Sequence, residues 1–450
     1  MANNLKVGYA RVNITPPMGI HIAGYYKERI ADGVLDELEA CAVAVGDGKT
    51  TALLITIDHC GLNKVYLNEW RENIAKATGV PAERIMLNPT HAHSGPDLGN
   101  TNNAAIVQLL PIYYANVAQA AKEAMNDRSP ATMETGVSYT EGLNFVRHYT
   151  TSRDEIYGDN ISLNGYITGH TSDPDNQIQL IRFRREAEDK KDILAVNWQA
   201  HPKLDSTADT KEGRKNRRML SADYVGAARD YVEANSDVLF AFYLGAAGNL
   251  NTYSKIRGET VSTNCKEFGD LLGGYIMDGM EILKPVEAGQ MKVTLTQRYC
   301  EAVYDHSEDY KLEDAQKIYK VWTATNSSDQ ALQAAPDAEI YSPYHAQSII
   351  TRSQKTERSK MLELNAIRVG SIAFATFPYE MFDVNGLFVK EGSPFDTTFI
   401  LSMSAGTNGY VAAEYTFQGR GTYEVHNRQF EKGTAENMAS IMVEMLNELK

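Results

Sequence analysis

Short apolar runs alternate along this chain with polar turns and with segments of helical periodicity. The pattern is clearest near the start, where apolar residues 39–45 and 51–57 flank the turn formed by residues 46–49, a strong hairpin signal. Residues 63–78 follow with helical spacing of their apolar positions, and residues 85–87 form a third apolar run, which is expected to belong to a strand that reaches His91. The order strand, helix, strand predicts an α/β sheet.

The same alternation continues to the end of the chain. Further strands are expected at residues 6–14, 132–139, 178–183, 193–198, 238–244, 291–299, 362–368, 371–377 and 397–401. Further helices are expected at residues 103–125 with an interruption at Pro111, and at residues 221–234, 264–283, 312–324 and 434–449, whereas residues 326–348 look like loop. No composition break divides the chain. We therefore expect one large domain spanning residues 1–450, of the α/β class with mixed α+β as an alternative, in which central mixed β-sheets are flanked by helices.

Composition limits the function classes. The chain is 43% hydrophobic and 23% charged, an ordinary globular balance, and its formal net charge of −14 argues against nucleic acid or an anionic membrane as the main partner. No apolar run approaches the roughly 18 residues of a membrane-spanning helix. The first six residues lack the apolar core of a signal peptide, which predicts a soluble, cytoplasmic protein, although a chain with a trimmed leader would look the same. The four cysteines include no Cys-x-x-Cys pair and are expected to be reduced, buried thiols.

Several predicted strands end in residues that can bind metal. His91 and His93 lie in the stretch Thr-His-Ala-His-Ser-Gly-Pro, and their i, i+2 spacing would place both on the same side of an extended chain. Three other strand ends offer His201, Glu380 and Tyr410. Catalytic zinc usually takes three protein ligands and keeps one position open. Taken singly, His201 could instead cap a strand, Glu380 could begin a helix and Tyr410 could belong to the core, so residue chemistry alone leaves both interpretations open.

Five segments in the right order carry a resemblance to a known family. They are residues 7–16 (VGYARVNITP), 90–96 (THAHSGP), 248–251 (GNLN), 378–380 (PYE) and 409–411 (GYV). With them, nearly the whole chain resembles the catalytic domain of the neutral (non-lysosomal) ceramidase family. The resemblance implies a zinc ion held by four residues, namely His91, His201, Glu380 and Tyr410. It also implies that His93, Arg147 and Tyr423 line the site.

Two departures from the family pattern bear on the substrate. The family has a serine that contributes to amide cleavage where this chain has Asn251, which can hydrogen-bond a substrate but cannot act as a hydroxyl nucleophile. The chain also ends at Lys450 without the family's C-terminal immunoglobulin-like domain. Asn251 argues against ceramide cleavage itself, and the expected absence of that domain and of a leader, which go with secreted, lipid-facing members of the family, favours a smaller or more polar substrate.

These expectations define a zinc-dependent amidohydrolase that cleaves a C–N bond of an N-acyl or other small amide by metal-activated water. His93 would accept a proton or bind the oxyanion, or alternatively fix His91 in place. Arg147 and Tyr423 would stabilise negative charge on the carbonyl oxygen, with a surface salt bridge as the alternative for Arg147. A zinc-dependent esterase or lactonase, and a non-catalytic metal-containing binding protein, stay open as alternatives. The expected partner is a small amide or ester; the sequence leaves open the oligomeric state and a second metal.

Overall fold

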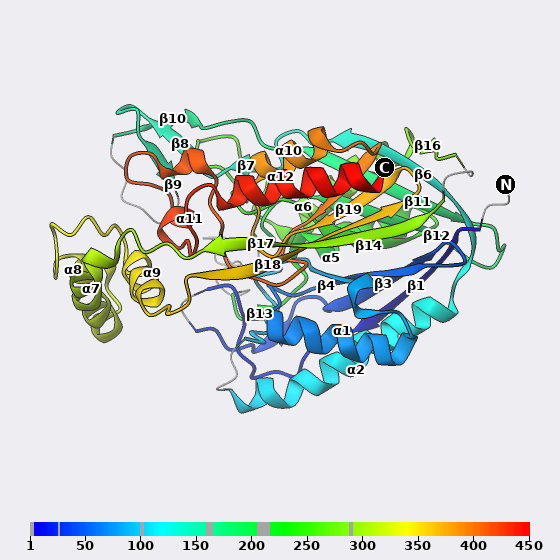
Figure 1. Ribbon diagram of the computed structural model, residues 1–450, viewed down its shortest axis with the longest axis horizontal. Coiled ribbons are helices and arrows are strands. Elements are labelled where there is room, and N and C mark those ends of the chain that lie inside the picture. The colour runs from blue at the N-terminus through cyan, green and yellow to red at the C-terminus, as the bar shows by residue number, and fades with distance from the viewer. Residues whose placement is uncertain (1–3, 26–27, 100–102, 159–164, 205–216, 288–290) are drawn as a thin grey trace.

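Two β-sheets packed face to face form the centre of the protein, and helices cover the outer face of each (Figure 1). The computed structural model describes residues 4–25, 28–99, 103–158, 165–204, 217–287 and 291–450. The first three residues, on which part of the prediction about a leader depends, lie outside this range. The predicted α/β class with mixed sheets flanked by helices is confirmed.

The large sheet is formed mostly by the first half of the chain. Its strands, in spatial order, are β14 (Val238–Leu244), β12 (Asp192–Trp198), β11 (Gln177–Arg185), β6 (Ser129–Tyr139), β1 (Lys6–Asn13), β3 (Glu39–Gly46), β4 (Thr51–Ile57) and β5 (Ile85–Pro89), and β16 (Lys284–Pro285) pairs with β6. The second sheet contains β17 (Val293–Val303), β18 (Ser359–Val369), β19 (Ile372–Thr376) and β20 (Thr397–Leu401). Both sheets are mixed, because β4–β5, β12–β14 and β19–β20 are parallel pairs among antiparallel neighbours.

Shorter strands surround one end of the molecule. They are β2 (Gly33–Val34) with β13 (Met219–Leu220), β7 (Phe145–Val146) with β15 (Leu250–Asn251), and the small sheet of β8 (His148–Thr151), β9 (Ile156–Gly158) and β10 (Ile167–His170). The helices are α1 (Lys64–Thr78), α2 (Ala104–Asn126), α5 (Asp223–Asn235), α6 (Cys265–Met280), α7 (Leu312–Thr325), α8 (Ser328–Leu332), α9 (Pro343–Ser353), α10 (Asp383–Gly392), α11 (Tyr423–His426) and α12 (Thr434–Leu449).

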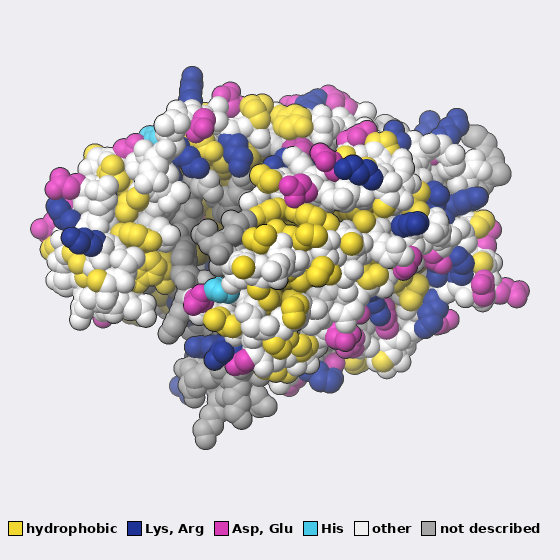
Figure 2. Space-filling model, turned by 90° about the horizontal axis from the view of Figure 1, so that it is seen from below, with side chains coloured by type: hydrophobic (Ala, Val, Ile, Leu, Met, Phe, Trp, Pro, Cys, Tyr) yellow, Lys and Arg dark blue, Asp and Glu magenta, His cyan; other side chains and the backbone are white. Residues whose placement is uncertain are grey.

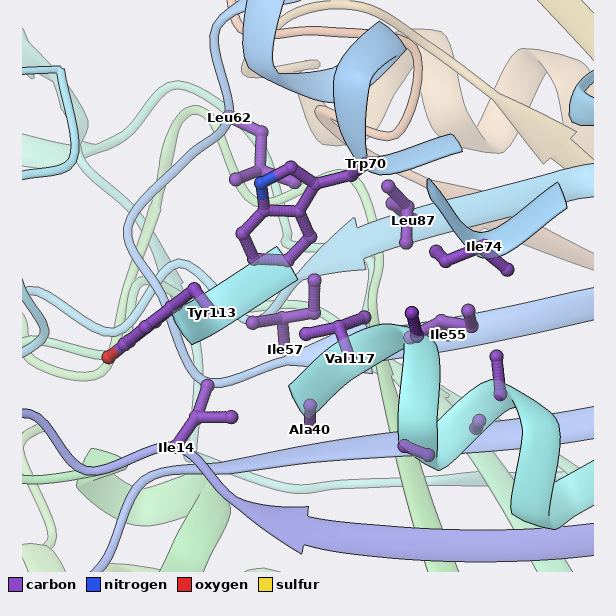
Figure 3. Close-up of a cluster of buried hydrophobic side chains, with 14 of the residues drawn as sticks. Ile14, Ala40, Ile55, Ile57, Leu62, Trp70, Ile74, Leu87, Tyr113 and Val117 are labelled. Atoms are coloured by element: carbon purple, nitrogen blue, oxygen red, sulfur yellow. The ribbon is translucent and has the colours of Figure 1, made fainter. Parts of the chain in front are cut away.

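Alternation along the strands determines which side chains enter which core. The inner faces of the two sheets bury residues such as Val43, Phe183 and Phe374 between them. The outer face of β1, β3, β4 and β5 is covered by α1 and α2, where Trp70 and Tyr113 pack against Ile57 (Figure 3). α5 and α6 cover the outer face of β11, β12 and β14, and α10 and α12 cover the second sheet. The resulting order is helices, sheet, sheet, helices.

The structure corrects two predictions about helices. α2 runs without a break through Pro111, because its buried face on the sheet compensates for the one missing hydrogen bond. Residues 326–348 are not simply loop: they contain α8 and most of α9, which with α7 form a small lobe between β17 and β18. This helical lobe has its own core, including Ile318, Ala346 and Ile349, and stands apart at the left of the molecule (Figures 1 and 2). The sequence predicted α7 but not α8 and α9, so the lobe as a unit was missed, because α8 is only one turn long and the lobe's core is small.

A buried asparagine joins the two sheets where their strands end. Asn88, in β5, donates from Nδ2 to the Ser402 carbonyl at 2.7 Å and to Ser404 Oγ at 3.1 Å, just beyond β20. Its Oδ1 accepts from the Leu244 backbone N–H at 2.8 Å, at the end of β14. The carboxyl ends of strands from both sheets are therefore held at one place.

Within the described ranges, no helix combines the length and apolarity needed to cross a bilayer.

Candidate metal centre

Four side chains predicted from the sequence lie together at these carboxyl ends. His91 follows β5 and His201 follows β12 in the large sheet, whereas Glu380 follows β19 and Tyr410 follows β20 in the second. Parallel neighbouring strands bring their ends to the same edge of a sheet, and the Asn88 contacts bring the two edges together. Segments hundreds of residues apart in sequence therefore meet.

The distances place two imidazoles, a carboxylate and a phenol around one small volume. The ligand atoms of His91, His201 and Glu380 all lie within 4.8 Å of one another. Glu380 Oε2 is 3.2 Å from His91 Nε2 and 3.3 Å from His201 Nε2. Tyr410 Oη is 3.3 Å from His201 Nε2, and a backbone bridge pairs Glu380 with Tyr410. His91, His201 and Glu380 are all buried.

Hydrogen bonds on the far side of each imidazole fix its orientation. His201 Nδ1 donates to the Ala247 carbonyl at 2.8 Å and the Leu250 carbonyl at 3.1 Å. His91 Nδ1 donates to the Cys60 carbonyl at 2.5 Å. In both residues Nε2 therefore faces the shared volume, as in metal-binding histidines whose second nitrogen is held by a carbonyl.

His91 reaches the site by leaving the strand. β5 ends at Pro89, and His91 has a φ of 68°, a left-handed conformation that is uncommon for a residue with a side chain. The expectation that an extended chain points His91 and His93 to the same side is therefore wrong. The turn instead brings His93 Nε2 to 3.2 Å from His91 Nε2, and the His93 backbone N–H donates to the Pro202 carbonyl at 3.0 Å.

The electrostatics favour the metal-binding protonation states for most of these groups. Burial, the Arg147 charge and His91 lower the pKa of His201 to about 3. Burial together with His91 and His201 also lowers the pKa of His93. Burial acts to raise the pKa of Glu380, but the two imidazoles outweigh it and hold that pKa well below its usual range. At neutral pH the centre therefore offers neutral imidazoles at His201 and His93 and an ionised carboxylate, whereas Cys60 and Glu380 outweigh burial and raise the pKa of His91, which would give up its proton to a bound cation.

The clearest sign that a cation fits here is an oxygen left without a hydrogen bond. Glu380 Oε2 is buried, and in the described part of the protein it has no hydrogen-bond partner despite its short distances to the two imidazole nitrogens. A buried anionic oxygen without a donor is costly, and coordination of a cation would remove that cost. Imidazole, carboxylate and phenol donors suit zinc or a similar divalent ion.

An open pocket of about 610 Å³ leads to these residues. His91, His93, Glu380 and Tyr410 form its inner wall, and residues of α9 in the helical lobe form the facing wall. The volume is in the range of small-molecule sites in proteins.

Two solved structures share this architecture. The neutral ceramidase from Pseudomonas aeruginosa superposes with a TM-score of 0.72 at 16% sequence identity, over 100% of this chain and 75% of that chain. This protein has the neutral ceramidase fold. A ceramidase complexed with C2 is similar, with a TM-score of 0.71, 14% identity and the same coverage of both chains. Comparisons of the sequence with known protein families and with curated proteins give no match.

Within this neutral ceramidase fold, Arg147 is a buried residue rather than a surface one. It follows β7 and is 3% exposed. Its Nε and one terminal nitrogen lie 2.6 Å from Glu424 Oε1, and its terminal nitrogen also donates to the Gly248 carbonyl at 2.8 Å. The guanidinium carbon lies 5.4 Å from the centroid of the Tyr410 ring and 5.9 Å from that of Tyr423. The surface salt bridge considered from the sequence is therefore excluded.

Tyr423 and Asn251, the remaining predicted site residues, differ in their access to the pocket. Tyr423 begins α11, lines the pocket, and packs its ring 5.7 Å from that of Tyr410 in an edge-on arrangement. Asn251 is fully buried in β15, where it pairs with Phe145, and the residues that line the pocket do not include it. A direct contact of Asn251 with a substrate in this pocket has no support in the present arrangement.

Two features of the site were not predicted from the sequence. They are the groups that position Arg147, and the pocket wall that faces the metal centre. Glu424 follows Tyr423 directly and is fully buried, but nothing in the local pattern separates it from an ordinary surface glutamate. The α9 wall did have a signal. Ser342 before Pro343 is an N-cap followed by proline in the first turn, and Ser342 Oγ accepts from the His345 backbone N–H.

Proposed function

We propose that this protein is a zinc-dependent hydrolase that cleaves the C–N bond of a small amide. The observation that carries the proposal is the buried cluster of His91, His201 and Glu380, whose ligand atoms lie within 4.8 Å of one another at the inner end of an open pocket. The likeness of the fold to neutral ceramidases supports amide chemistry over other metal-assisted reactions.

His91, His201, Glu380 and Tyr410 would hold the metal. A bound zinc ion supplies Lewis acidity, which lowers the pKa of water to near 7 and polarises a carbonyl group. Burial and Glu380 raise the pKa of the Tyr410 phenol, so it is protonated unless a cation is near. Tyr410 would therefore be the ligand whose protonation depends most on whether the metal is bound.

His93 would accept a proton during the reaction. Its ring is neutral at physiological pH because burial and the two neighbouring imidazoles lower its pKa. The alternative, that His93 only fixes His91, is less favoured, because the Cys60 carbonyl already holds His91 Nδ1 and His93 faces Nε2 instead. Tyr423, which lines the pocket, would stabilise the negative charge that develops on the substrate oxygen, and Arg147, which is buried beside the Tyr410 and Tyr423 rings and does not line the pocket, would add its positive charge from there. The same groups would serve an ester, so an esterase or lactonase differs from this proposal only in substrate.

The proposal is tested by metal content and turnover in the same preparations. Purified protein should contain zinc by elemental analysis, lose turnover of an N-acyl amide panel on dialysis against a chelator, and recover it when zinc is added. The variant H91A should lose both zinc and turnover, whereas H306A, which changes a histidine with a 40% exposed side chain, should keep both. Thermal unfolding of each variant would show whether it is folded.

Three outcomes would contradict the proposal. Full zinc occupancy in H91A would remove this residue from the metal centre. Turnover of esters without amides would identify an esterase. Bound zinc with no turnover of either substrate class would favour a metal-containing binding protein.

A further inference from the structure

The described residues that line the pocket carry more positive than negative charge, which is unusual for an acidic protein. The chain contains 58 acidic and 44 basic residues, yet Glu380 is the one carboxylate among the described residues that line the pocket. Glu380 belongs to the metal centre. The wall formed by the helical lobe contributes two cations, Arg352 and Lys355. An excess of positive charge in a recess draws anionic ligands toward it.

Arg352 is already used within the protein. It is 2% exposed, and its terminal nitrogens donate to Glu308 Oε2 at 2.7 Å, Ser348 Oγ at 2.9 Å and the Arg428 carbonyl at 2.9 Å. Its hydrogen bonds hold the helical lobe against the rest of the molecule. It is therefore a poor candidate for the group that binds a substrate.

Lys355 differs from Arg352 in being available. It lies just beyond the end of α9, is half-buried, and forms no ion pair with any carboxylate in the described part of the chain. Its ammonium group lies 5.4 Å from the centroid of the Tyr304 ring. Burial, Lys355 and Lys64 together lower the pKa of the neighbouring Lys360. Lys64 is paired with Glu363, so among these three lysines the charge that faces the pocket without a carboxylate partner in the described residues is that of Lys355.

The rest of the pocket wall is polar and aromatic. Its described side chains include the tyrosines at positions 25, 344 and 423 and the amides Gln347, Asn427 and Gln429. Among the described lining residues there is no valine, leucine, isoleucine, methionine or phenylalanine. The surface that these side chains expose is nonetheless more apolar than polar, because ring faces and carbon stems form much of it, so the wall offers hydrogen-bonding groups beside apolar surface.

We propose that the substrate is a small polar amide that carries an anionic group, of the N-acyl amino acid class, and that Lys355 binds this group. The proposal rests on the proposed hydrolase function and specifies the substrate class for it. The amide would lie at the metal centre, and the anionic group would face the helical lobe. Lys355 is then a specificity-determining residue, and its effect is confined to substrates with that charge.

Paired substrates separate charge from every other property of the ligand. The assay compares N-acetyl amino acids with their carboxamides, which have the same shape without the charge. The wild type should hydrolyse the acids with a kcat/KM about tenfold higher, and added salt should reduce this advantage. K355Q should lower kcat/KM for the acids about five- to tenfold, mainly through KM, and that for the carboxamides less than twofold. K355R should keep most of the preference, and K355E should reverse it.

A matched control is K320Q, which changes an exposed lysine on α7 of the same lobe and should behave as the wild type. Equal kcat/KM for acids and carboxamides in the wild type, or equal losses for both in K355Q, would overturn the proposal for Lys355 while leaving the hydrolase function intact. Preferential hydrolysis of a long-chain lipid amide would have the same consequence. Absence of turnover on every amide tested, with zinc bound, would instead refute the hydrolase function itself.

Discussion

Replacing Glu424 with glutamine tests how the fold positions Arg147. Glu424 is 0% exposed, and its two carboxylate oxygens have different partners. Oε1 accepts from Arg147, and Oε2 accepts from His148 Nε2 at 2.8 Å. Glutamine keeps the shape but replaces one oxygen with an N–H₂ group, so one of the two donors must then face another donor.

The expected loss of stability is large because the whole network is buried. Burial acts to raise the pKa of Glu424, but Arg147 and His148 outweigh it and hold the pKa well below the usual range, so the native carboxyl group is ionised. Removing one partner of a buried ion pair leaves an uncompensated charge and costs about 3–5 kcal/mol. We therefore expect E424Q to lower the free energy of unfolding by about 3–5 kcal/mol at pH 7.

The sign of the pH dependence follows from the direction of the pKa shift. A carboxyl group whose native pKa lies below its unfolded value stabilises the native state above the unfolded pKa. The difference in unfolding free energy between the wild type and E424Q should therefore be constant from pH 8 to about pH 5 and shrink as the pH falls further. Urea unfolding at a series of pH values, with an unchanged m-value, measures it.

Activity provides the second measurement. A guanidinium displaced by about 1 Å can cost about a hundredfold in rate, so kcat/KM should fall about that much while zinc content stays at the wild-type level. The matched control is E414Q, whose carboxylate has a 61% exposed side chain and pairs with Lys432 at the surface, and which should change stability by less than about 0.5 kcal/mol. Wild-type stability and activity in E424Q would refute the positioning role of Glu424.

Two further changes probe the packing that supports the centre. Arg71 and Lys64 outweigh burial and lower the pKa of Glu363 to about 2. E363Q should therefore lose about 3 kcal/mol of unfolding free energy at pH 7 and less than half of that at pH 3, as measured by urea unfolding. A constant loss across this pH range would contradict the assignment. Trp70, on the buried face of α1, is 1% exposed (Figure 3), so W70A should destabilise the protein by about 3–5 kcal/mol in the same assay. A loss below about 1 kcal/mol would mean that this core is not close-packed.

Much of the sheet could be predicted from the sequence because its strands have strong local signals. The hairpin of β3 and β4 and the capped helix α1 match the prediction to within a residue, since the turn and the Asn63 cap are local features. The position of His201 and Glu380 just past strand ends was also predictable. Their convergence was not, because it depends on the order of strands in two sheets and on the buried contacts of Asn88.

The features that could not be predicted from the sequence are those determined by tertiary contacts. The left-handed conformation of His91 has no local signature, since neither glycine nor asparagine marks it. It is held by a backbone hydrogen bond from His91 N–H to the His59 carbonyl and by the side-chain bond to the Cys60 carbonyl. The same applies to Glu424, whose role appears only when α11 packs against the end of β7.

These observations explain why one fold can carry different substrate preferences. The four residues of the candidate metal centre follow strands of the two central sheets, whose buried contacts leave little freedom to change. The facing wall instead comes from the helical lobe, which has its own small core and is joined to the rest where Arg352 and Glu308 contact Arg428. Substitutions on the pocket side of α9 can therefore alter the charge and polarity of the pocket without disturbing the strand ends.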